Sequence, residues 1–462
     1  MEPRLALQFL GAARHVTGSK HLLEVGDSKV LLDCGLVQGP RRMADAQNRK
    51  LPIAGRDVDA LVLSHAHIDH CGALPRLVRD GYSGPIWCTD ATADMLRMML
   101  MDSAHIQAQD ARHLRKRGHD FEPLYDEVDV ERTLRLVKPV PYHQQFEVTP
   151  ELRVTFLDAG HILGAAIVVM DVEQGPRRRR VVFTGDHGRK NLPILRDPER
   201  IPECDALITE STYGDREHAG REDMMADLAR IVAEELHDGG RVIVPAFAVG
   251  RTQSVVLFLG QLMRSGALPK LPIWVDSPMS REATRIMARH PDLFDDETRA
   301  LIRQGHHPLL FEGVTYVADV EESKQLNHVR SGIIVSASGM CESGRVLHHL
   351  EQSIGRKEDC VLLVGYQGQG TLGRRLLDGE KKVRIYGEEH DVRCKVRTIS
   401  GFSAHADWPE LLASTRHLAG RCKQVFVVHG EDAPAESYAG RLRDAGFGDV
   451  VVPSKFDRVP IG

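Results

Sequence analysis

The chain has 462 residues, enough for about three domains of average size. Its 42% hydrophobic and 27% charged residues are typical of a globular protein. A formal net charge of −5 excludes a protein that binds nucleic acid through overall positive charge, so any attraction for RNA or DNA must be local.

Cysteine usage and hydropathy indicate the compartment. The eight cysteines include no Cys-x-x-Cys pair, which favours buried thiols in a reducing cytoplasm over a disulfide framework. No run approaches the roughly 20 apolar residues of a membrane span. The short apolar start of the chain is interrupted by Gln8 and does not suit a signal peptide. We therefore expect a cytoplasmic protein with no membrane contact.

Three strands are predicted at the start of the chain. Residues 5–10, 21–25 and 29–33 are apolar runs separated by glycine-containing turns. Asp33 ends the third run and would therefore lie at an edge of the sheet. An acid in that place can orient a metal-binding histidine. The alternative is an ordinary turn aspartate before Gly35.

The most informative stretch follows the apolar run 58–63. Four potential metal ligands occur within six residues: His65, His67, Asp69 and His70. An apolar run that ends in a polar turn predicts a buried strand carrying a loop to the carboxyl edge of a sheet. His65 and His67, two residues apart, can share one metal, whereas the other two begin a predicted helix through Asp80 and face elsewhere. Because one tetrahedral ion with an open position takes about three protein ligands, this arrangement favours two metals over one. A loop that is rich in histidine by accident is the alternative.

Two later strands also end in potential ligands. The strand predicted over 152–157 leads to His161, which is flanked by glycines that give the backbone room to approach an ion. The strand predicted over 181–186 ends at Asp186. Between them, Arg177–Arg180 are predicted to form the solvated tip of a hairpin, with RNA contact as the alternative.

The chain changes character after the next predicted strand, 206–210, which ends at Glu210. From about residue 217 to residue 393, a strand followed by a glycine-containing or serine-containing loop and a helix occurs four times. The four strands are predicted at 242–247, 273–276, 333–338 and 361–365. This alternation predicts a parallel sheet flanked by helices. Its loops would place helix amino termini where phosphates can bind, although tight turns between strands and helices require glycine in any case.

Two further histidines follow apolar segments near the end of the chain. His405 follows 399–403 and His429 follows 425–428, so both are expected at a sheet edge. Taken singly, each is more typical of a core histidine than of a ligand.

The sequence His65-x-His67-x-Asp69-His70 resembles the defining motif of the metallo-β-lactamase superfamily. The repeated strand-loop-helix segments resemble the β-CASP domain, which marks the members that process nucleic acids. The resemblance covers nearly the whole chain. It implies an α/β fold, namely a metallo-β-lactamase αββα sandwich with an inserted β-CASP domain. We predict that residues 1–210 and 394–462 form the sandwich and that residues 211–393 form the insert.

The resemblance also implies a metal site with two ions per chain. Metal one would be held by His65, His67 and His161, and metal two by Asp69, His70 and His429, with Asp186 bridging both. Imidazole and carboxylate ligands suit zinc, and manganese is also compatible with them. Asp33 and Asp69 are counted among the catalytic residues, together with His405 and its partner Glu210.

The histidine at position 429 favours the RNA-directed branch of the family, because DNA-directed members tend to carry valine there. That branch includes the endonuclease subunit of pre-mRNA 3′-end cleavage and its compact prokaryotic relatives. We therefore predict an endoribonuclease for RNA processing or decay, with 5′-to-3′ exonuclease activity as an additional mode. A metal-activated hydroxide would attack the phosphorus of single-stranded RNA while His405 protonates the departing 3′ oxygen, leaving 5′-phosphate and 3′-hydroxyl products. Phosphate contacts are assigned to Ser403, Arg251 and Ser338.

Three other functions stay open at this point. They are a non-catalytic scaffold subunit that binds RNA, a DNA nuclease of the same fold, and a small-molecule hydrolase such as a thioesterase or lactamase. A homodimer is left open beside a monomer.

Overall fold

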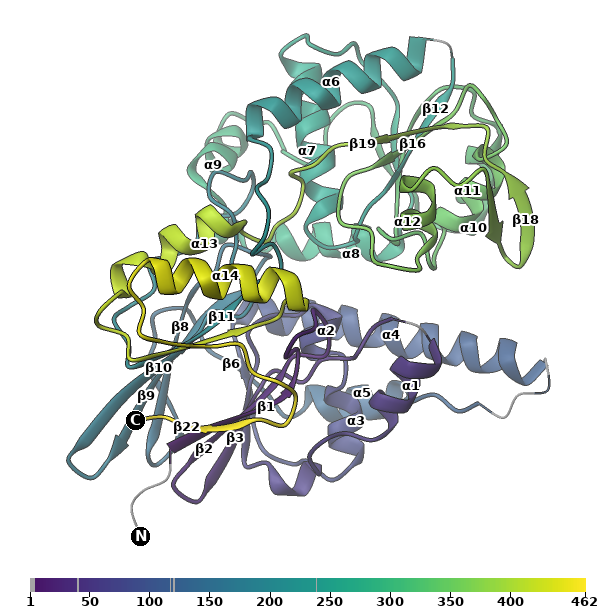
Figure 1. Ribbon diagram of the computed structural model, residues 1–462. Helices are drawn as coiled ribbons and strands as arrows, with labels where there is room; N and C mark the ends of the chain where they lie inside the picture. The colour runs from purple at the N-terminus through teal and green to yellow at the C-terminus, as the bar shows by residue number, and fades with distance from the viewer. Residues whose placement is uncertain (1–4, 40, 117, 119–120, 238) are drawn as a thin grey trace. The chain divides into compact units, whose positions relative to one another are not determined.

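The structure is a computed structural model that describes the whole chain except residues 1–4, 40, 117, 119–120 and 238. It divides into two compact units, which are described in turn (Figure 1). The first unit consists of Met1–Lys190, Asp197–Glu217 and His405–Gly462, and the second of Asn191–Arg196 and His218–Ala404.

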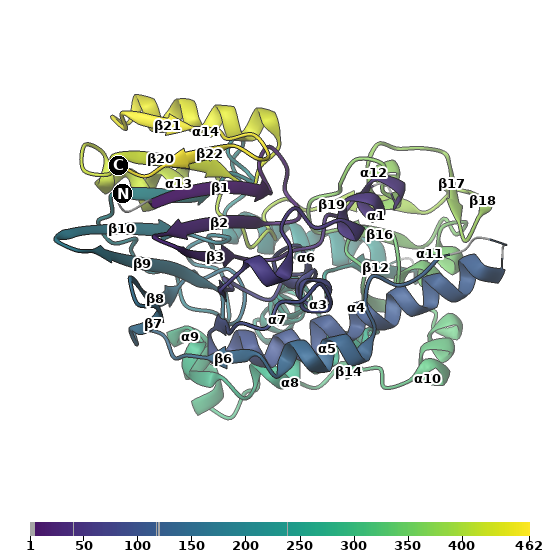
Figure 2. The same ribbon diagram turned by 90° about the horizontal axis from the view of Figure 1, so that it is seen from below.

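The first unit contains two sheets. Strands of one sheet follow the order β22-β1-β2-β3-β4-β5-β6, antiparallel from β22 to β3 and parallel from β3 to β6. Figure 2 shows β1, β2 and β3 side by side. The strands are β1 (Leu5–Gly11), β2 (Lys20–Val25), β3 (Ser28–Leu32), β4 (Ala60–Val62), β5 (Ile86–Cys88), β6 (Val137–Pro139) and β22 (Arg458–Pro460).

The other sheet follows the order β21-β20-β11-β10-β9-β8-β7. Strand β20, from the end of the chain, pairs in parallel with β11, which pairs in parallel with β10. The strands are β7 (Phe146–Thr149), β8 (Leu152–Asp158), β9 (Ala166–Gln174), β10 (Arg177–Phe183), β11 (Ala206–Glu210), β20 (Gln424–Val428) and β21 (Asp449–Val451).

Apolar side chains hold these layers together. Phe9 and Leu23 from the first sheet and Phe156, Phe183 and Phe426 from the second belong to one buried cluster, so the inner faces of the sheets pack on each other. A second buried cluster joins the outer face of the first sheet to helices, and α14 lies on β20 and β21 of the second sheet. The helices of the unit are α1 (Arg41–Arg49), α2 (Ile68–Cys71), α3 (Leu74–Arg79), α4 (Asp90–Lys116), α5 (Glu127–Leu134), α13 (Trp408–Thr415) and α14 (Asp432–Asp444). The predicted αββα sandwich is confirmed.

The second unit is built on a six-stranded sheet in which every pair of neighbours is parallel, in the order β14-β13-β15-β12-β16-β19. Helices α6 and α7 pack on one face of this sheet through one apolar cluster. Helices α11 and α12 pack on the other face through a second apolar cluster. The predicted parallel sheet flanked by helices is confirmed. The strands are β12 (Arg241–Pro245), β13 (Ile273–Val275), β14 (Val314–Tyr316), β15 (Gly332–Ser336), β16 (Cys360–Leu363) and β19 (Lys395–Thr398), with a separate hairpin of β17 (Lys382–Ile385) and β18 (Glu388–Asp391). The helices are α6 (Arg221–His237), α7 (Arg251–Arg264), α8 (Pro278–Met287), α9 (Asp296–Arg303), α10 (Val320–Gln325), α11 (Val346–Ser353) and α12 (Leu372–Leu377).

Two local predictions were wrong. The helix predicted over residues 71–80 is broken: α2 ends at Cys71 and α3 begins at Leu74. Pro75 lies in the first turn of α3, where its missing N–H costs nothing, so it favours the start of a new helix there. The run Arg177–Arg180 lies on β10 and not in the hairpin turn, because Arg180 pairs with Asp171 of β9 and binds its carboxylate at 2.7 Å.

A buried histidine on β2 was not anticipated. His21 is fully buried, and its ring meets those of Phe9 and Phe183 edge to face, with centroids 5.6 Å away in both cases. Neither ring nitrogen has a hydrogen-bond partner among the described residues. Burial lowers the pKa of His21 to about 3, so the folded protein keeps this imidazole neutral.

The low pKa of His21 predicts how the free energy of unfolding depends on pH. Below about pH 6.5 an unfolded chain protonates this histidine, whereas the folded chain does not until about pH 3, so stability is lost as the pH falls through that window. Between pH 7 and pH 5, wild type should lose about 2 kcal/mol more unfolding free energy than the variant His21→Leu. Urea unfolding at both pH values measures the difference. Parallel pH dependences for the two proteins would contradict it.

Candidate functional site

The predicted ligands of the first unit meet at the carboxyl ends of strands from both sheets. Strands β3 and β4 run parallel in one sheet and β10, β11 and β20 run parallel in the other. The carboxyl ends of parallel strands lie at the same edge of a sheet, which is where open α/β sheets place their sites. Glu210 is the last residue of β11, and the loops that follow the other strand ends carry Asp33, His65, His67, Asp186 and His429.

One cluster contains three histidines and an aspartate. Ligand atoms of His65, His67, His161 and Asp186 all lie within 4.8 Å of one another. Nδ1 of His67 is 3.0 Å from Nε2 of His65 and 3.2 Å from Nε2 of His161. Asp186 Oδ2 is 3.4 Å from His65 Nε2 and 3.5 Å from His161 Nε2.

A second cluster contains Asp69, His70 and His429, again with ligand atoms within 4.8 Å. Nε2 of His70 lies 3.1 Å from Nε2 of His429, which lies 3.5 Å from Asp69 Oδ2. The other oxygen of Asp186, Oδ1, is 3.2 Å from His70 Nε2. The carboxylate of Asp186 therefore reaches both clusters, one oxygen to each.

The donors of both clusters fit divalent cations. Burial lowers the pKa of His67 to about 3, which leaves the imidazole neutral, the form that binds a metal. Burial would raise the pKa of Asp186, but His429 and His70 hold it well below its usual range, so this carboxyl is ionised. Asp186 Oδ1 is buried and has no hydrogen-bond partner among the described residues. Imidazole nitrogens that face one another at about 3 Å beside an ionised carboxylate are the donor set of a metal site.

Asp33 contacts the second cluster through His70. Its Oδ2 is 2.7 Å from His70 Nδ1, and its Oδ1 accepts a hydrogen bond of 2.8 Å from the backbone N–H of Ser64. Asp33 has a φ of 60°, a left-handed conformation that aspartate tolerates better than most residues. A carboxylate bonded to the far nitrogen of a histidine fixes which ring nitrogen faces the metal.

Glu210 and His405 form a pair beside the clusters. His405 Nδ1 lies 3.0 Å from Glu210 Oε2 and 3.9 Å from Asp186 Oδ2. Glu210 is fully buried, whereas the side chain of His405 is 19% exposed. Burial lowers the pKa of His405, but the charges of Glu210 and Asp186 outweigh it and raise this pKa to about 9. The pair can therefore hold a proton at a position that solvent reaches.

The three residues assigned to phosphate contacts belong to the second unit. Arg251 donates from Nε to the carbonyl of Phe402 at 3.2 Å, and its guanidinium lies over the Phe247 ring at 5.1 Å. Ser338 Oγ accepts a hydrogen bond of 3.1 Å from the backbone N–H of Glu342. Ser403 is 3% exposed. Their contact with a phosphate stays a prediction.

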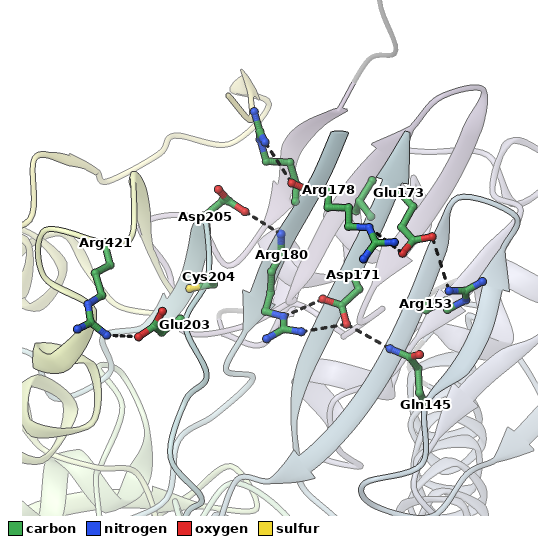
Figure 3. A pocket seen from close by; sticks show the side chains of 12 residues that line it. Gln145, Arg153, Asp171, Glu173, Arg178, Arg180, Glu203, Cys204, Asp205 and Arg421 are labelled. Carbon is green, nitrogen blue, oxygen red and sulfur yellow. Dashed lines mark hydrogen bonds and ion pairs between the residues drawn. The ribbon is translucent and has the colours of Figure 1, made fainter. Parts of the chain in front are cut away.

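A hollow of about 540 Å³ lies elsewhere in the first unit, along β8, β9 and β10 (Figure 3). Its arginines face acids: Arg178 Nε is 3.4 Å from a Glu173 carboxylate oxygen, and Arg421 pairs with Glu203. Within the run Arg177–Arg180, Arg178 and Arg180 thus each face an acid, because Arg180 is also paired with Asp171 at 2.7 Å. We therefore assign no RNA contact to this run.

The sequence reasoning missed the hydroxyl groups around the acids. Ser64 donates to Asp33 at 2.9 Å, and Thr212 donates to Glu210 at 2.6 Å. A signal was present, because Ser64 directly precedes the histidine motif and Thr212 follows Glu210 by two positions.

Among the described residues, no helix is both long and apolar enough to cross a membrane.

The shared carboxylate makes a prediction. Replacing Asp186 by alanine removes a donor from both clusters, so Asp186→Ala should lose most of the bound metal. Zinc per chain, measured by elemental analysis of the purified protein, tests this expectation. Asp171→Ala, which removes a surface acid from β9, should bind as much zinc as wild type. Full zinc occupancy in Asp186→Ala would contradict the bridging assignment.

Comparison with known proteins shows which family this chain belongs to. Three family models match the chain: the metallo-beta-lactamase superfamily over residues 18–230, the Beta-Casp domain over 252–376, and the Zn-dependent metallo-hydrolase RNA specificity domain over 389–453. A crystal structure from Enterococcus faecalis of a protein of unknown function aligns with a TM-score of 0.55 and 12% identity, covering 99% of this chain and 100% of the other. That likeness concerns the fold alone.

Curated relatives cover most of the chain. It is 38% identical to ribonuclease TTHA0252 of Thermus thermophilus, over 91% of this chain and 92% of that protein. It is 31% identical to the transcription termination factor FttA of Methanosarcina mazei, over 92% of this chain and 66% of the relative, and 30% identical to FttA of Methanocaldococcus jannaschii, over 99% and 72%. The chain thus spans about two thirds of these termination factors. Its motif, its fold and these relatives agree that the chain belongs to the β-CASP family of the metallo-β-lactamase superfamily.

Proposed function

We propose that this protein is a two-zinc ribonuclease that hydrolyses single-stranded RNA and leaves 5′-phosphate and 3′-hydroxyl ends. The observation that supports it most is the position of the His405–Glu210 pair, 3.9 Å from the carboxylate that joins the two ligand clusters. A metal-dependent hydrolase of phosphodiesters uses a cation site and a proton donor together. A scaffold that only binds RNA requires neither, so the complete donor set favours an enzyme.

Each residue at the site has a role in this proposal. His65, His67 and His161 would hold one zinc ion, and Asp69, His70 and His429 the other, with Asp186 shared. When bound, the two cations supply Lewis acidity, which lowers the pKa of water and stabilises negative charge on the phosphoryl oxygens. Asp33 keeps Nδ1 of His70 engaged and so leaves Nε2 for the metal.

His405 is the proposed general acid. Glu210 accepts the Nδ1–H of the imidazole, which directs the second N–H away from the buried acid. A protonated His405 can then give its Nε2 proton to the 3′ oxygen that leaves phosphorus. A group in this role typically contributes about 10² to 10⁴ in rate.

The side chains that solvent reaches indicate where a substrate would enter. His405 and Asp69 are each 19% exposed, whereas the side chains of Asp186 and His161 are 1% exposed. The match to an RNA specificity domain and the 38% identity to a protein named ribonuclease support RNA as the substrate. With a net charge of −5, the cations themselves would provide much of the local attraction for phosphate.

Cleavage of labelled RNA tests the proposal. Single-stranded RNA carrying a label at either end should be cut at internal bonds, which creates new 3′-hydroxyl and 5′-phosphate ends, and a chelator in excess over zinc should stop the reaction. Single-stranded DNA of the same sequence, a thioester and a β-lactam serve as comparison substrates. Turnover of a comparison substrate but not of RNA would overturn the proposal, as would zinc-loaded protein that binds RNA without cutting it. Release of single nucleotides from the 5′ end would identify the exonuclease mode in place of the endonuclease mode.

The proposed acid makes a prediction of its own. His405→Ala should keep the wild-type zinc content and fold, because His405 is outside both ligand clusters, but RNA cleavage should fall by about 10² to 10⁴. His143→Ala, at an exposed histidine of the same unit, should cleave at the wild-type rate. Unchanged turnover in His405→Ala would remove this residue from the mechanism.

A further inference from the structure

Thr212 lies between the proton-holding pair and the second ligand cluster. It follows β11 by two positions, and its side chain is half-buried. Its hydroxyl oxygen Oγ1 is 2.6 Å from Glu210 Oε2, 3.1 Å from His429 Nδ1 and 3.1 Å from the backbone oxygen of His429. One hydroxyl group thus touches both functional parts of the site.

The single proton of this hydroxyl decides how the contacts are shared. A carboxylate only accepts hydrogen bonds, and Glu210 offers the shortest contact, so Thr212 donates to Glu210. The lone pairs of Oγ1 then accept the Nδ1–H of His429. With its proton on Nδ1, His429 has a free lone pair on Nε2. That nitrogen lies 3.1 Å from His70 Nε2 and 3.5 Å from Asp69 Oδ2.

Without Thr212, the other nitrogen of His429 could compete for a metal. Nδ1 lies 3.5 Å from Asp186 Oδ1, and Asp186, Glu210 and His429 themselves form a group whose ligand atoms lie within 4.8 Å. In a histidine ligand, the hydrogen bond of one ring nitrogen determines which nitrogen binds the metal. His70 follows the same rule, because its Nδ1 is 2.7 Å from Asp33.

We propose that Thr212 is a positioning residue that fixes His429 with Nε2 toward the second metal and links this ligand to the Glu210–His405 pair. Glu210 also accepts a backbone N–H from His187 at 2.6 Å and the Nδ1–H of His405 at 3.0 Å. One buried carboxylate therefore holds the proposed acid directly and a metal ligand through the threonine hydroxyl. The metal-binding part of this inference needs only the two clusters, whereas its effect on turnover rests on the proposed function.

Two substitutions of Thr212 distinguish the effect of its hydroxyl group from the effect of the rest of its side chain. Thr212→Val keeps the shape but removes the hydroxyl, and Thr212→Ser keeps the hydroxyl. Thr133→Val is the matched control, because Thr133 is a buried threonine of α5 whose hydroxyl donates only to a helix carbonyl, at 2.8 Å. Zinc affinity is measured by competition with a chromogenic chelator, and the thermal unfolding of each variant checks its fold.

We expect the weaker of the two bound zinc ions to lose about 10- to 100-fold in affinity in Thr212→Val, the range found when a histidine ligand loses its outer hydrogen-bond partner. Thr212→Ser should stay close to wild type, and Thr133→Val should match it. At saturating zinc, Thr212→Val should lower kcat for RNA and leave KM unchanged, because Thr212 holds groups of the enzyme and not the substrate.

The proposal is overturned if Thr212→Val binds both zinc ions as tightly as wild type, or if Thr212→Ser loses as much affinity as the valine variant. A wild-type protein that binds zinc and does not cleave RNA would refute the proposed function. The chelator measurement would still decide the assignment of Thr212 in that case.

Discussion

The structure of the first unit depends on one electrostatic constraint: burying many polar side chains together costs free energy unless they satisfy one another. The two ligand clusters bring the ring nitrogens of five histidines to within about 3 Å of other ring nitrogens or of carboxylate oxygens. Buried polar groups that do not satisfy one another are costly. A divalent cation in each cluster would replace these poor contacts by strong ones. The hydrogen bonds around the clusters therefore serve to hold the donors ready for metal.

The fold meets this constraint by using strand ends. Each ligand loop begins where a buried strand stops, and the strands that carry them are held by the apolar layer between the sheets. His429 has a φ of 48° and Asp33 a φ of 60°, so the backbone adopts an uncommon conformation at two of these ends. The buried strands thus hold the site residues in place, and two of these residues adopt a left-handed backbone conformation there.

Sequence reasoning could find the residues of the two clusters because strand ends and metal-binding residue types are both local signals. His65 and His67 directly follow an apolar run, and Asp186 and Glu210 end theirs. The fold class followed from the motif and from the alternation of strands and helices. The features that sequence reasoning did not predict depend on side chains that come into contact only after folding. His21 is buried between two phenylalanines from different strands, and the hydroxyl of Thr212 contacts a histidine that follows it by 217 positions. The arginine run was misplaced because its acidic partners on β9 cannot be recognised before the hairpin register is known.

We infer that one carboxylate, Asp186, joins two metal sites. The most direct test is a crystal structure of the zinc-loaded protein with anomalous scattering recorded on both sides of the zinc absorption edge. We expect two zinc peaks: one among His65, His67 and His161, the other among Asp69, His70 and His429, with one Asp186 oxygen directed at each. A single peak, or two peaks of which one has no Asp186 oxygen beside it, would show that Asp186 does not join two metal sites.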